Sequence, residues 1–206
     1  ILITGSPGSG KTTLSRILLD DYKIYEFNSS NIISLANFKQ VINDIVKIKT
    51  IYKKKCIIFD EIDGIEKKII EEIILFINSY RSIIPIICIC NINNMKKKIL
   101  DKLLKISYEI NIKKPSAENI KLFINNIANK ENIVLNNEVI DEIIIMSYND
   151  YRNILNILQF CKGSNIDNII NIEYINKLKK FLCIKNIELH DNENIKKIIY
   201  SKESNI

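Results

Sequence analysis

The sequence contains no Cys-x-x-Cys motif, and its number of cysteines, five, is odd. Zinc sites and disulfide frameworks need paired cysteines at regular spacings, so neither is predicted. The cysteines are interpreted instead as small, reduced residues of the core. Cys88 and Cys90 lie two residues apart in an expected strand, which places their side chains on one face. The full set is Cys56, Cys88, Cys90, Cys161 and Cys183.

Long hydrophobic runs are also missing. No apolar stretch reaches the length that crosses a membrane, and the N-terminus carries no signal-peptide pattern. We therefore expect a soluble, intracellular protein with no membrane partner. The first residue is Ile1 rather than methionine, and it already lies in a strand-like run. This start predicts a trimmed domain or a fragment of a longer protein.

Glycine and arginine are scarce, with 5 glycines and only three arginines in 206 residues. Apolar residues make up 47% of the chain, which is typical of a globular protein, and the length suits one or two domains. The formal net charge of +6 permits contact with nucleic acid. A lysine-rich, solvated surface explains the same charge equally well, so charge alone leaves the partner open.

Apolar runs alternate with helical spacing through the first half of the chain. The expected strands are 1–4, 24–27, 56–59 and 86–90, with a weaker candidate at 107–112. The expected helices between them are 11–20, 35–49 and 65–80. This alternation predicts an α/β domain over residues 1–114, with a parallel sheet and helices on both faces.

The pattern changes after Pro115. Residues 116–130, 136–147 and 150–162 have helical spacing with no strand between them, and Pro115–Ser116 is a good helix start. We therefore expect a small all-helical domain over 115–163. The Asn-rich segment 164–206 is expected to form a helical extension.

The strongest motif follows the first strand-like run and matches GxxxxGK[ST]. In such a loop, backbone N–H groups surround phosphate oxygens, and the next helix points its positive dipole end at them. Several positions tolerate no Cβ, and three of the five glycines stand here. The motif predicts that Lys11 contacts the β- and γ-phosphates of ATP and that Thr12 ligates Mg²⁺. The predicted ATP-binding residues are Gly5, Ser6, Pro7, Gly8, Ser9, Gly10, Lys11, Thr12 and Thr13.

An acidic pair, Asp60 and Glu61, follows the apolar run 56–59. The carboxyl ends of parallel strands form the edge at which ligands bind. Asp60 is predicted to hold Mg²⁺, and Glu61 to act as the general base that polarises the attacking water. An acidic pair after a strand is also common at a helix start, so this prediction depends on the P-loop upstream. Together, the glycine-rich P-loop and the acidic pair indicate hydrolysis of ATP.

Two further side chains are candidates for contact with the γ-phosphate. Asn91 follows the run 86–90, which in a parallel sheet would lie between the P-loop strand and the Asp60 strand. Its alternative role is that of an ordinary strand-ending turn residue. Arg152 opens the third helix of the helical domain, where its guanidinium would clamp the γ-phosphate and couple nucleotide state to lid angle. A surface salt bridge is the alternative for Arg152.

Five segments resemble, in their order and spacing, the clamp-loader ATPases of the AAA+ class. They are GSPGSGKTTL, IYEFNSS, FDEIDG, PIICICN and YRNILNILQF. FDEIDG and PIICICN are similar to the large-subunit versions in replication factor C, whereas small subunits usually carry DEAD at the first of these. The likeness covers residues 1 to about 162. It implies an AAA+ ATPase domain with a helical lid, with ATP and Mg²⁺ as cofactors, Asn91 as sensor 1 and Arg152 as the sensor 2 arginine.

The resemblance also implies partners. Family members form a hetero-pentamer with clamp-loader small subunits, close on a ring-shaped sliding clamp and primer–template DNA when ATP binds, and release both on hydrolysis. In this family, DNA is bound through its backbone. The resemblance also implies a location in the nucleus or at another site of DNA replication. By analogy, Ser29–Ser30 and Lys53–Lys55 are candidate DNA contacts. The segment Ile74–Ile84 is a candidate clamp contact, with core packing as its alternative.

The sequence departs from the family pattern in ways that carry information. Small subunits have a Ser-Arg-Cys motif whose arginine enters the neighbouring ATP site, but the matching stretch Leu103–Tyr108 has no arginine. A large subunit is expected to look like this and to need a partner's arginine finger for full activity. We expect the family's segment ahead of the P-loop and its C-terminal collar to lie outside these 206 residues. Residues 164–206 would begin the link to that collar.

Other functions compete with this hypothesis. A large subunit for cohesion or checkpoint loading has equally similar motifs. A nucleotide kinase has a similar P-loop, but three arginines are few for a phosphate-binding lid. A helicase loader or Holliday-junction motor would usually keep an arginine finger in the helix after the run 86–90, and none is found there. A non-enzymatic scaffold is disfavoured because Lys11, Thr12, Asp60 and Glu61 are all present.

Overall fold

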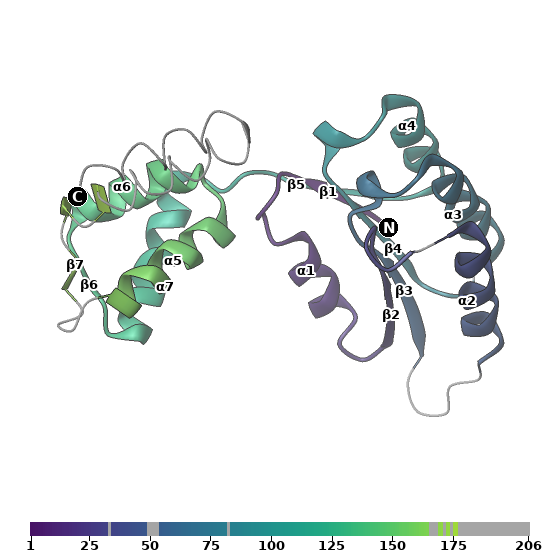
Figure 1. The fold of residues 1–206 in the computed structure, drawn as a ribbon, viewed down its shortest axis with the longest axis horizontal. Helices are drawn as coiled ribbons and strands as arrows, with labels where there is room; N and C mark the ends of the chain where they lie inside the picture. Colours follow the sequence, from purple (N-terminus) through teal and green to yellow (C-terminus); the bar gives the residue numbers. More distant parts are fainter. Residues whose placement is uncertain are drawn as a thin grey trace, which may run out of the picture. The chain divides into compact units, whose positions relative to one another are not determined.

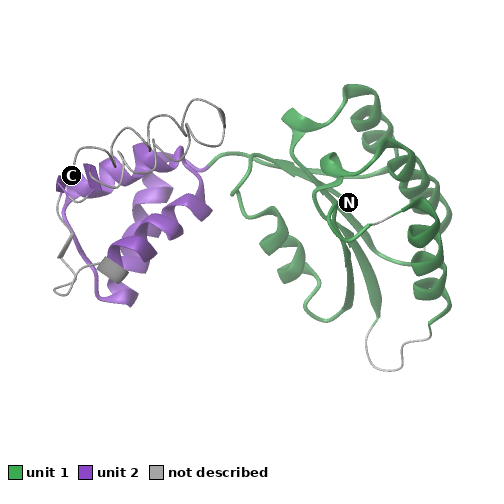
Figure 2. Ribbon diagram, viewed as in Figure 1, with its two compact units in different colours: residues 1–114 green, residues 115–206 purple. Residues whose placement is uncertain are grey.

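The chain divides into two compact units, Ile1–Lys114 and Pro115–Ile206 (Figure 2). The computed structural model describes residues 1–32, 34–48, 54–81, 83–164, 169–170, 172–173 and 175–176. Cys183, Lys53 and most of the expected extension 164–206 lie outside the described residues.

The first unit contains a parallel sheet in the order β2-β3-β4-β1-β5 (Figure 1). Its strands are β1 (Leu2–Gly5), β2 (Lys23–Phe27), β3 (Lys55–Phe59), β4 (Ile86–Cys90) and β5 (Glu109–Ile112). The predicted α/β fold is confirmed. The position of β4 between β1 and β3 agrees with the prediction as well, and β4 therefore brings Asn91 between the segments that follow its two neighbours.

Helices cover both faces of this sheet (Figure 1). They are α1 (Lys11–Leu18) on one face, and α2 (Leu35–Lys47), α3 (Lys67–Tyr80) and α4 (Lys97–Ile106) on the other. Alternate strand residues supply the two cores: Ile87 and Ile89 pack on the α1 side, and Cys88 and Cys90 on the opposite side. The prediction that the two cysteines share a face is confirmed. Burial raises the pKa of Cys88 to about 12, so its thiol stays neutral.

Helix α4 was not predicted from the sequence, although its signal is present. Ile99 and Leu103 lie four residues apart and are both buried, which is the spacing of one helix face. Three consecutive lysines and an Asn-rich approach obscure its start. Two single turns of 3₁₀ helix also follow strands: η1 (Ile62–Gly64) after β3, and η2 (Ile92–Asn94) after β4.

The second unit packs three helices around its own core. They are α5 (Ala117–Glu131), α6 (Asn137–Ser147) and α7 (Tyr151–Ser164), and α5 begins at the predicted cap, where Ser116 Oγ accepts from Asn119 N. The unit also contains a short parallel pair, β6 (Val134–Leu135) with β7 (Ile169–Ile170), which an all-helical domain did not predict. Ile175 is fully buried in the same core, so part of the expected extension belongs to this unit.

No helix within the described part of the chain combines the length and the apolarity needed to cross a membrane.

Lys55 closes the C-terminal end of α2. Its Nζ donates to the carbonyl oxygens of Ile45, Val46 and Ile48, at 2.8, 2.8 and 2.7 Å. These carbonyls have no partner within the helix and carry the negative end of its dipole, so an ammonium group stabilises them. A candidate DNA contact from the sequence therefore has a structural role, whereas its neighbour Lys54 is exposed.

We expect Lys55→Met to lower the free energy of unfolding by about 1–2 kcal/mol, because three carbonyls lose a charged donor. Urea denaturation measures this change. Lys54→Met is the matched control, and it should change stability by less than about 0.5 kcal/mol because that side chain is exposed. Equal changes in the two variants would contradict the capping role.

Candidate active site

The predicted site residues of the first unit follow three neighbouring strands. The glycine-rich loop begins at the end of β1, Asp60 directly follows β3, and Asn91 directly follows β4. Because β3, β4 and β1 are adjacent and parallel, their carboxyl ends meet at one edge of the sheet. Residues up to 80 positions apart in the chain are thereby brought into contact.

The glycine-rich loop has a backbone that side chains would obstruct. A Cβ on Gly5 would lie 2.6 Å from the carbonyl oxygen of Ile112, so only glycine fits beside β5. Gly10 has φ of 87°, in the left-handed region, and caps the start of α1 without a side-chain hydrogen bond. The first N–H groups of α1 are therefore not occupied by a capping side chain, which leaves them oriented as an anion site.

Lys11 joins the loop to the neighbouring strand. Its Nζ donates to Gly5 O at 3.1 Å, to Ser6 O at 2.7 Å and to Asn91 Oδ1 at 2.8 Å. The side chain is only 9% exposed, so the ammonium group lies at the base of the loop rather than in solvent. The predicted closeness of Asn91 to the P-loop strand is thus observed as a direct contact with Lys11.

Thr12 and Asp60 form a second contact across the site. Thr12 Oγ1 donates to Asp60 Oδ2 at 2.7 Å, and Asp60 Oδ1 accepts from the backbone N–H of Glu61 at 2.8 Å. The Thr12 hydroxyl and the Asp60 carboxylate are oxygen ligands of the type that Mg²⁺ prefers. No cluster of three or more His, Cys, Asp or Glu side chains suited to a metal occurs in the described ranges. The residues therefore fit a Mg²⁺ that takes its remaining ligands from phosphate and water, which is its usual mode with nucleotides.

Glu61 has an unusual backbone. Its φ and ψ are 50° and 43°, in the left-handed region that few residues other than glycine adopt. This conformation turns the chain from β3 into η1, where Ile62 is fully buried. The Glu61 side chain is exposed at the same edge of the sheet as Asp60. Strained backbone of this kind is concentrated at functional sites.

The other predicted residues occupy varied positions. Pro7 and Thr13 are exposed, and Gly8 is partly buried. The Ser9 hydroxyl is buried and has no hydrogen-bond partner within the described residues. Arg152 belongs to the second unit, where it is the second residue of α7 and exposed. Its backbone N–H donates to the capping carboxylate of Asp150 at 2.8 Å.

Sequence reasoning gave no role to Asp63, although it lies in the quoted FDEIDG segment. Its Oδ1 accepts from the backbone N–H of Asn91 at 3.0 Å, and its Oδ2 accepts from Asn94 Nδ2 at 3.3 Å. The nearby thiol of Cys90 has its pKa raised to about 11, first by burial and then by the Asp63 carboxylate. Cys90 is therefore a neutral core residue beside the site rather than a nucleophile.

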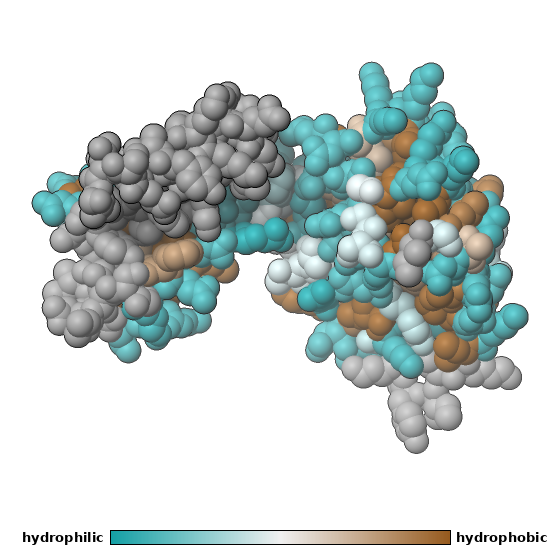
Figure 3. Space-filling model, viewed as in Figure 1, coloured by the Kyte–Doolittle hydropathy of each residue, from teal (hydrophilic) through white to brown (hydrophobic). Residues whose placement is uncertain are grey.

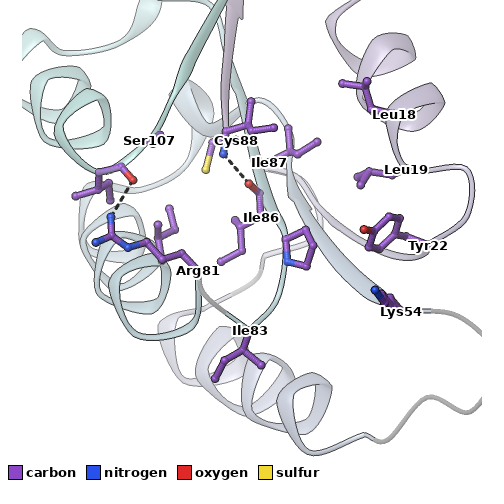
Figure 4. A pocket seen from close by; sticks show the side chains of 14 residues that line it. Leu18, Leu19, Tyr22, Lys54, Arg81, Ile83, Ile86, Ile87, Cys88 and Ser107 are labelled. Carbon is purple, nitrogen blue, oxygen red and sulfur yellow. Dashed lines mark hydrogen bonds between the residues drawn. The ribbon is translucent and has the colours of Figure 1, made fainter.

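A pocket of about 720 Å³ lies at the amino ends of the strands (Figure 4). Ile1, Lys54 and Ile86 line it where β1, β3 and β4 begin, and Arg81 Nη1 donates to Ile106 O at its side, at 3.4 Å. The glycine-rich loop, Asp60 and Asn91 lie at the carboxyl ends of the same strands. The pocket is therefore at the opposite edge of the sheet and takes no part in the site.

The candidate clamp segment 74–84 is divided between core and surface. Ile77 and Ile84 are buried, which fits the alternative of core packing, while Leu75 is 59% and Ile83 72% exposed. Figure 3 shows apolar side chains gathered over the part of the first unit where α2 and α3 lie, with hydrophilic side chains around them.

The family model of the ATPase family associated with various cellular activities (AAA) matches residues 1–115. The chain belongs to this AAA family. The AAA chain is 30% identical over 182 residues to replication factor C subunit 1 of Homo sapiens, covering 79% of this chain and 16% of that protein. It is 32% identical over 167 residues to the replication factor C large subunit of Pyrobaculum aerophilum, covering 77% of this chain and 39% of that protein. The predicted resemblance to the large-subunit family is confirmed.

Two further comparisons extend this result. The AAA chain is 29% identical over 196 residues to chromosome transmission fidelity protein 18 of Saccharomyces cerevisiae, covering 81% of this chain and 26% of that protein. Its fold is similar to the Holliday junction branch migration motor RuvB of Thermotoga maritima, with a TM-score of 0.65 and 16% identity, covering 89% of this chain and 61% of that one. The chain thus spans well under half the length of the three sequence relatives named.

Proposed function

We propose that this AAA protein binds ATP with Mg²⁺ and hydrolyses it as the large-subunit-like component of a DNA sliding-clamp loader. The observation that carries the proposal is the joint contact of Lys11 with Asn91 and of Thr12 with Asp60 at one sheet edge. The similarity to proteins named replication factor C subunit 1 and large subunit supports the loader role.

The loop and the start of α1 bind the triphosphate in this proposal. Backbone N–H groups of the loop and the positive end of the α1 dipole bind the phosphate oxygens. Lys11 exchanges its contacts with Ser6 O and Asn91 Oδ1 for the β- and γ-phosphates. Thr12 and Asp60 hold Mg²⁺, which supplies positive charge to the phosphate oxygens when bound.

Glu61 and Asn91 act on water. The exposed Glu61 carboxylate accepts a proton from the attacking water as general base, a role that contributes roughly 10²–10⁴-fold to the rate. Asn91, released from Lys11, orients that water and the γ-phosphate with its amide. The left-handed backbone at Glu61 turns the chain directly after Asp60, at the edge of the sheet.

Arginines complete the site from outside the first unit. Arg152 acts from the second unit as the residue that senses the γ-phosphate, and its exposed side chain at the start of α7 suits this role. The stretch Leu103–Tyr108 contains no arginine, and Leu103 itself is fully buried. Full activity therefore depends on an arginine finger from a neighbouring subunit.

The proposed partners are clamp-loader small subunits, a ring-shaped sliding clamp and the backbone of primer–template DNA, in the nucleus or at another site of DNA replication. A large subunit of an alternative loader for cohesion or checkpoint functions is the second candidate. The 29% identity to chromosome transmission fidelity protein 18 favours it about as much as the 30% identity to replication factor C subunit 1 favours the replicative form.

ATP hydrolysis by the chain, alone and mixed with clamp-loader small subunits, tests the proposal. We expect weak hydrolysis by the chain alone and stimulation of at least about tenfold with small subunits, clamp and primed DNA, because the finger arrives in trans. Unprimed single-stranded DNA is the matched control and should stimulate less. Transfer of phosphate to AMP by the chain alone would support a nucleotide kinase instead.

A further inference from the structure

We infer that Asp63 is a positioning residue for ATP hydrolysis, because it holds Asn91 in the place from which its side chain meets Lys11. The inference rests on the proposed function and adds to it a residue that acts through Asn91 rather than on the nucleotide itself.

The carboxylate of Asp63 holds both ends of the turn that follows β4. Oδ1 accepts from the backbone N–H of Asn91, the first residue after the strand, at 3.0 Å. Oδ2 accepts from the side-chain amide of Asn94, the last residue of η2, at 3.3 Å. Hydrogen bonds to an ionised carboxylate are stronger than those between neutral groups, so the contact with Oδ1 holds the backbone of Asn91 in place. The contact with Asn94 is longer and exposed, and it does not involve Asn91 directly.

Asn91 connects Asp63 to the P-loop through Lys11. Its backbone N–H is held by Asp63, while its Oδ1 accepts from Lys11 Nζ at 2.8 Å. Lys11 in turn contacts the carbonyl oxygens at the start of the loop. A displacement of about 1 Å in a catalytic group can cost roughly 10²-fold in rate, so the anchor of the Asn91 backbone affects what its amide can do.

The support beneath Asp63 is itself rigid. Ile62, on one side of it, is fully buried in the core. On the other side, a Cβ on Gly64 would lie 3.2 Å from Ser29 Cβ, so the turn packs closely against the loop after β2. The Gly64 N–H donates to Glu61 O at 2.9 Å, which closes the turn immediately after the proposed base. One short turn therefore sets the positions of both Glu61 and Asn91.

Three variants of the chain, assayed with Mg²⁺-ATP and small subunits, test the inference. Asp63→Ala should lower kcat by about tenfold or more while the Kd for ATP changes by less than about threefold, because only the arrangement for hydrolysis is disturbed. Asp63→Asn keeps an oxygen acceptor for the Asn91 N–H and should recover most of the rate. Asn94→Ala, which removes only the second contact, is the matched control and should change kcat by less than about threefold.

A double-mutant cycle separates positioning from general stabilisation. If Asp63 acts through Asn91, then Asp63→Ala should cause little further loss of kcat in the Asn91→Ala background. Losses that multiply, with each substitution acting independently, would overturn the inference. An unchanged kcat in Asp63→Ala would overturn it as well.

Amide hydrogen exchange gives a measurement that needs no hydrolysis. The Asn91 N–H should exchange faster in Asp63→Ala than in the parent chain, and Asp63→Asn should show an intermediate rate. Unchanged exchange at Asn91 overturns the inference even if the chain is an active ATPase. If the parent chain and its small subunits hydrolyse no ATP, the proposed function fails, while exchange at Asn91 still decides the role of Asp63. If Asp63→Ala does not fold, the exchange rate of the Asn91 N–H in Asp63→Asn, compared with that in the parent chain, decides the role of Asp63.

Discussion

Replacing Lys11 with alanine is expected to abolish ATP binding and to lower hydrolysis by at least about 100-fold. The ammonium group is the only side-chain charge observed in contact with both the glycine-rich loop and Asn91 within the described residues, at 2.7–3.1 Å. Alanine removes the positive charge that would meet the β- and γ-phosphates and leaves the amide of Asn91 without this donor. Equilibrium binding of a fluorescent ATP analogue and phosphate release in the presence of small subunits measure the two effects.

The matched control for this variant is Lys98→Ala. Lys98 is an exposed lysine of α4, outside the site, so its loss changes net charge equally without touching the loop. Hydrolysis by this variant should stay within about twofold of the parent chain. If Lys11→Ala still bound and hydrolysed ATP, the assignment of the loop as the phosphate site would be contradicted.

Replacing Glu61 with glutamine is expected to lower hydrolysis by about 10²–10³-fold while ATP binding is retained. The amide has the same size and accepts the same left-handed backbone, φ 50°, but it cannot take a proton from water. Single-turnover hydrolysis and equilibrium ATP binding, measured side by side, separate the two properties. The contrast with Lys11→Ala is diagnostic, because the lysine variant should lose both binding and turnover.

Glu66→Gln is the control for the glutamate substitution. Glu66 is exposed, stands five residues further on, and makes no side-chain capping bond at the start of α3. Its substitution should leave hydrolysis unchanged within about twofold. Full activity in Glu61→Gln would contradict the role of Glu61 as the general base.

The two halves of the candidate site differed in how far local pattern could predict them. The glycine-rich loop and the acids after β3 are contiguous segments whose chemistry can be recognised from residue type, because phosphate and metal binding restrict the allowed side chains. From the residues themselves, Asn91 was predicted through the rule that strands of a parallel sheet share one ligand-binding edge, together with the expected order of β3, β4 and β1. The family resemblance separately implied it as sensor 1.

Two lysines and one aspartate show where local pattern is insufficient. Lys55 stood in a basic run that suggested DNA contact, yet its ammonium group caps α2, a helix that ends eight residues earlier at Lys47. Lys11 was predicted to face phosphate, but its contact with Asn91 spans 80 residues. Asp63 was quoted within a motif and given no role, because its partners lie 28 and 31 residues away.

Sequence by itself determined which chemistry could be predicted: the triphosphate loop, the metal ligand and the base were proposed from residue types that few other functions require in that order. It also determined the alternation of strands and helices, since apolar periodicity depends only on neighbours along the chain. Tertiary structure alone decided which groups meet, including the Asp63 carboxylate with the Asn91 N–H and the Lys55 ammonium group with the carbonyl oxygens that end α2. Such contacts depend on the register of adjacent strands and the path of short turns, and residue spacing along the chain does not encode either of these directly.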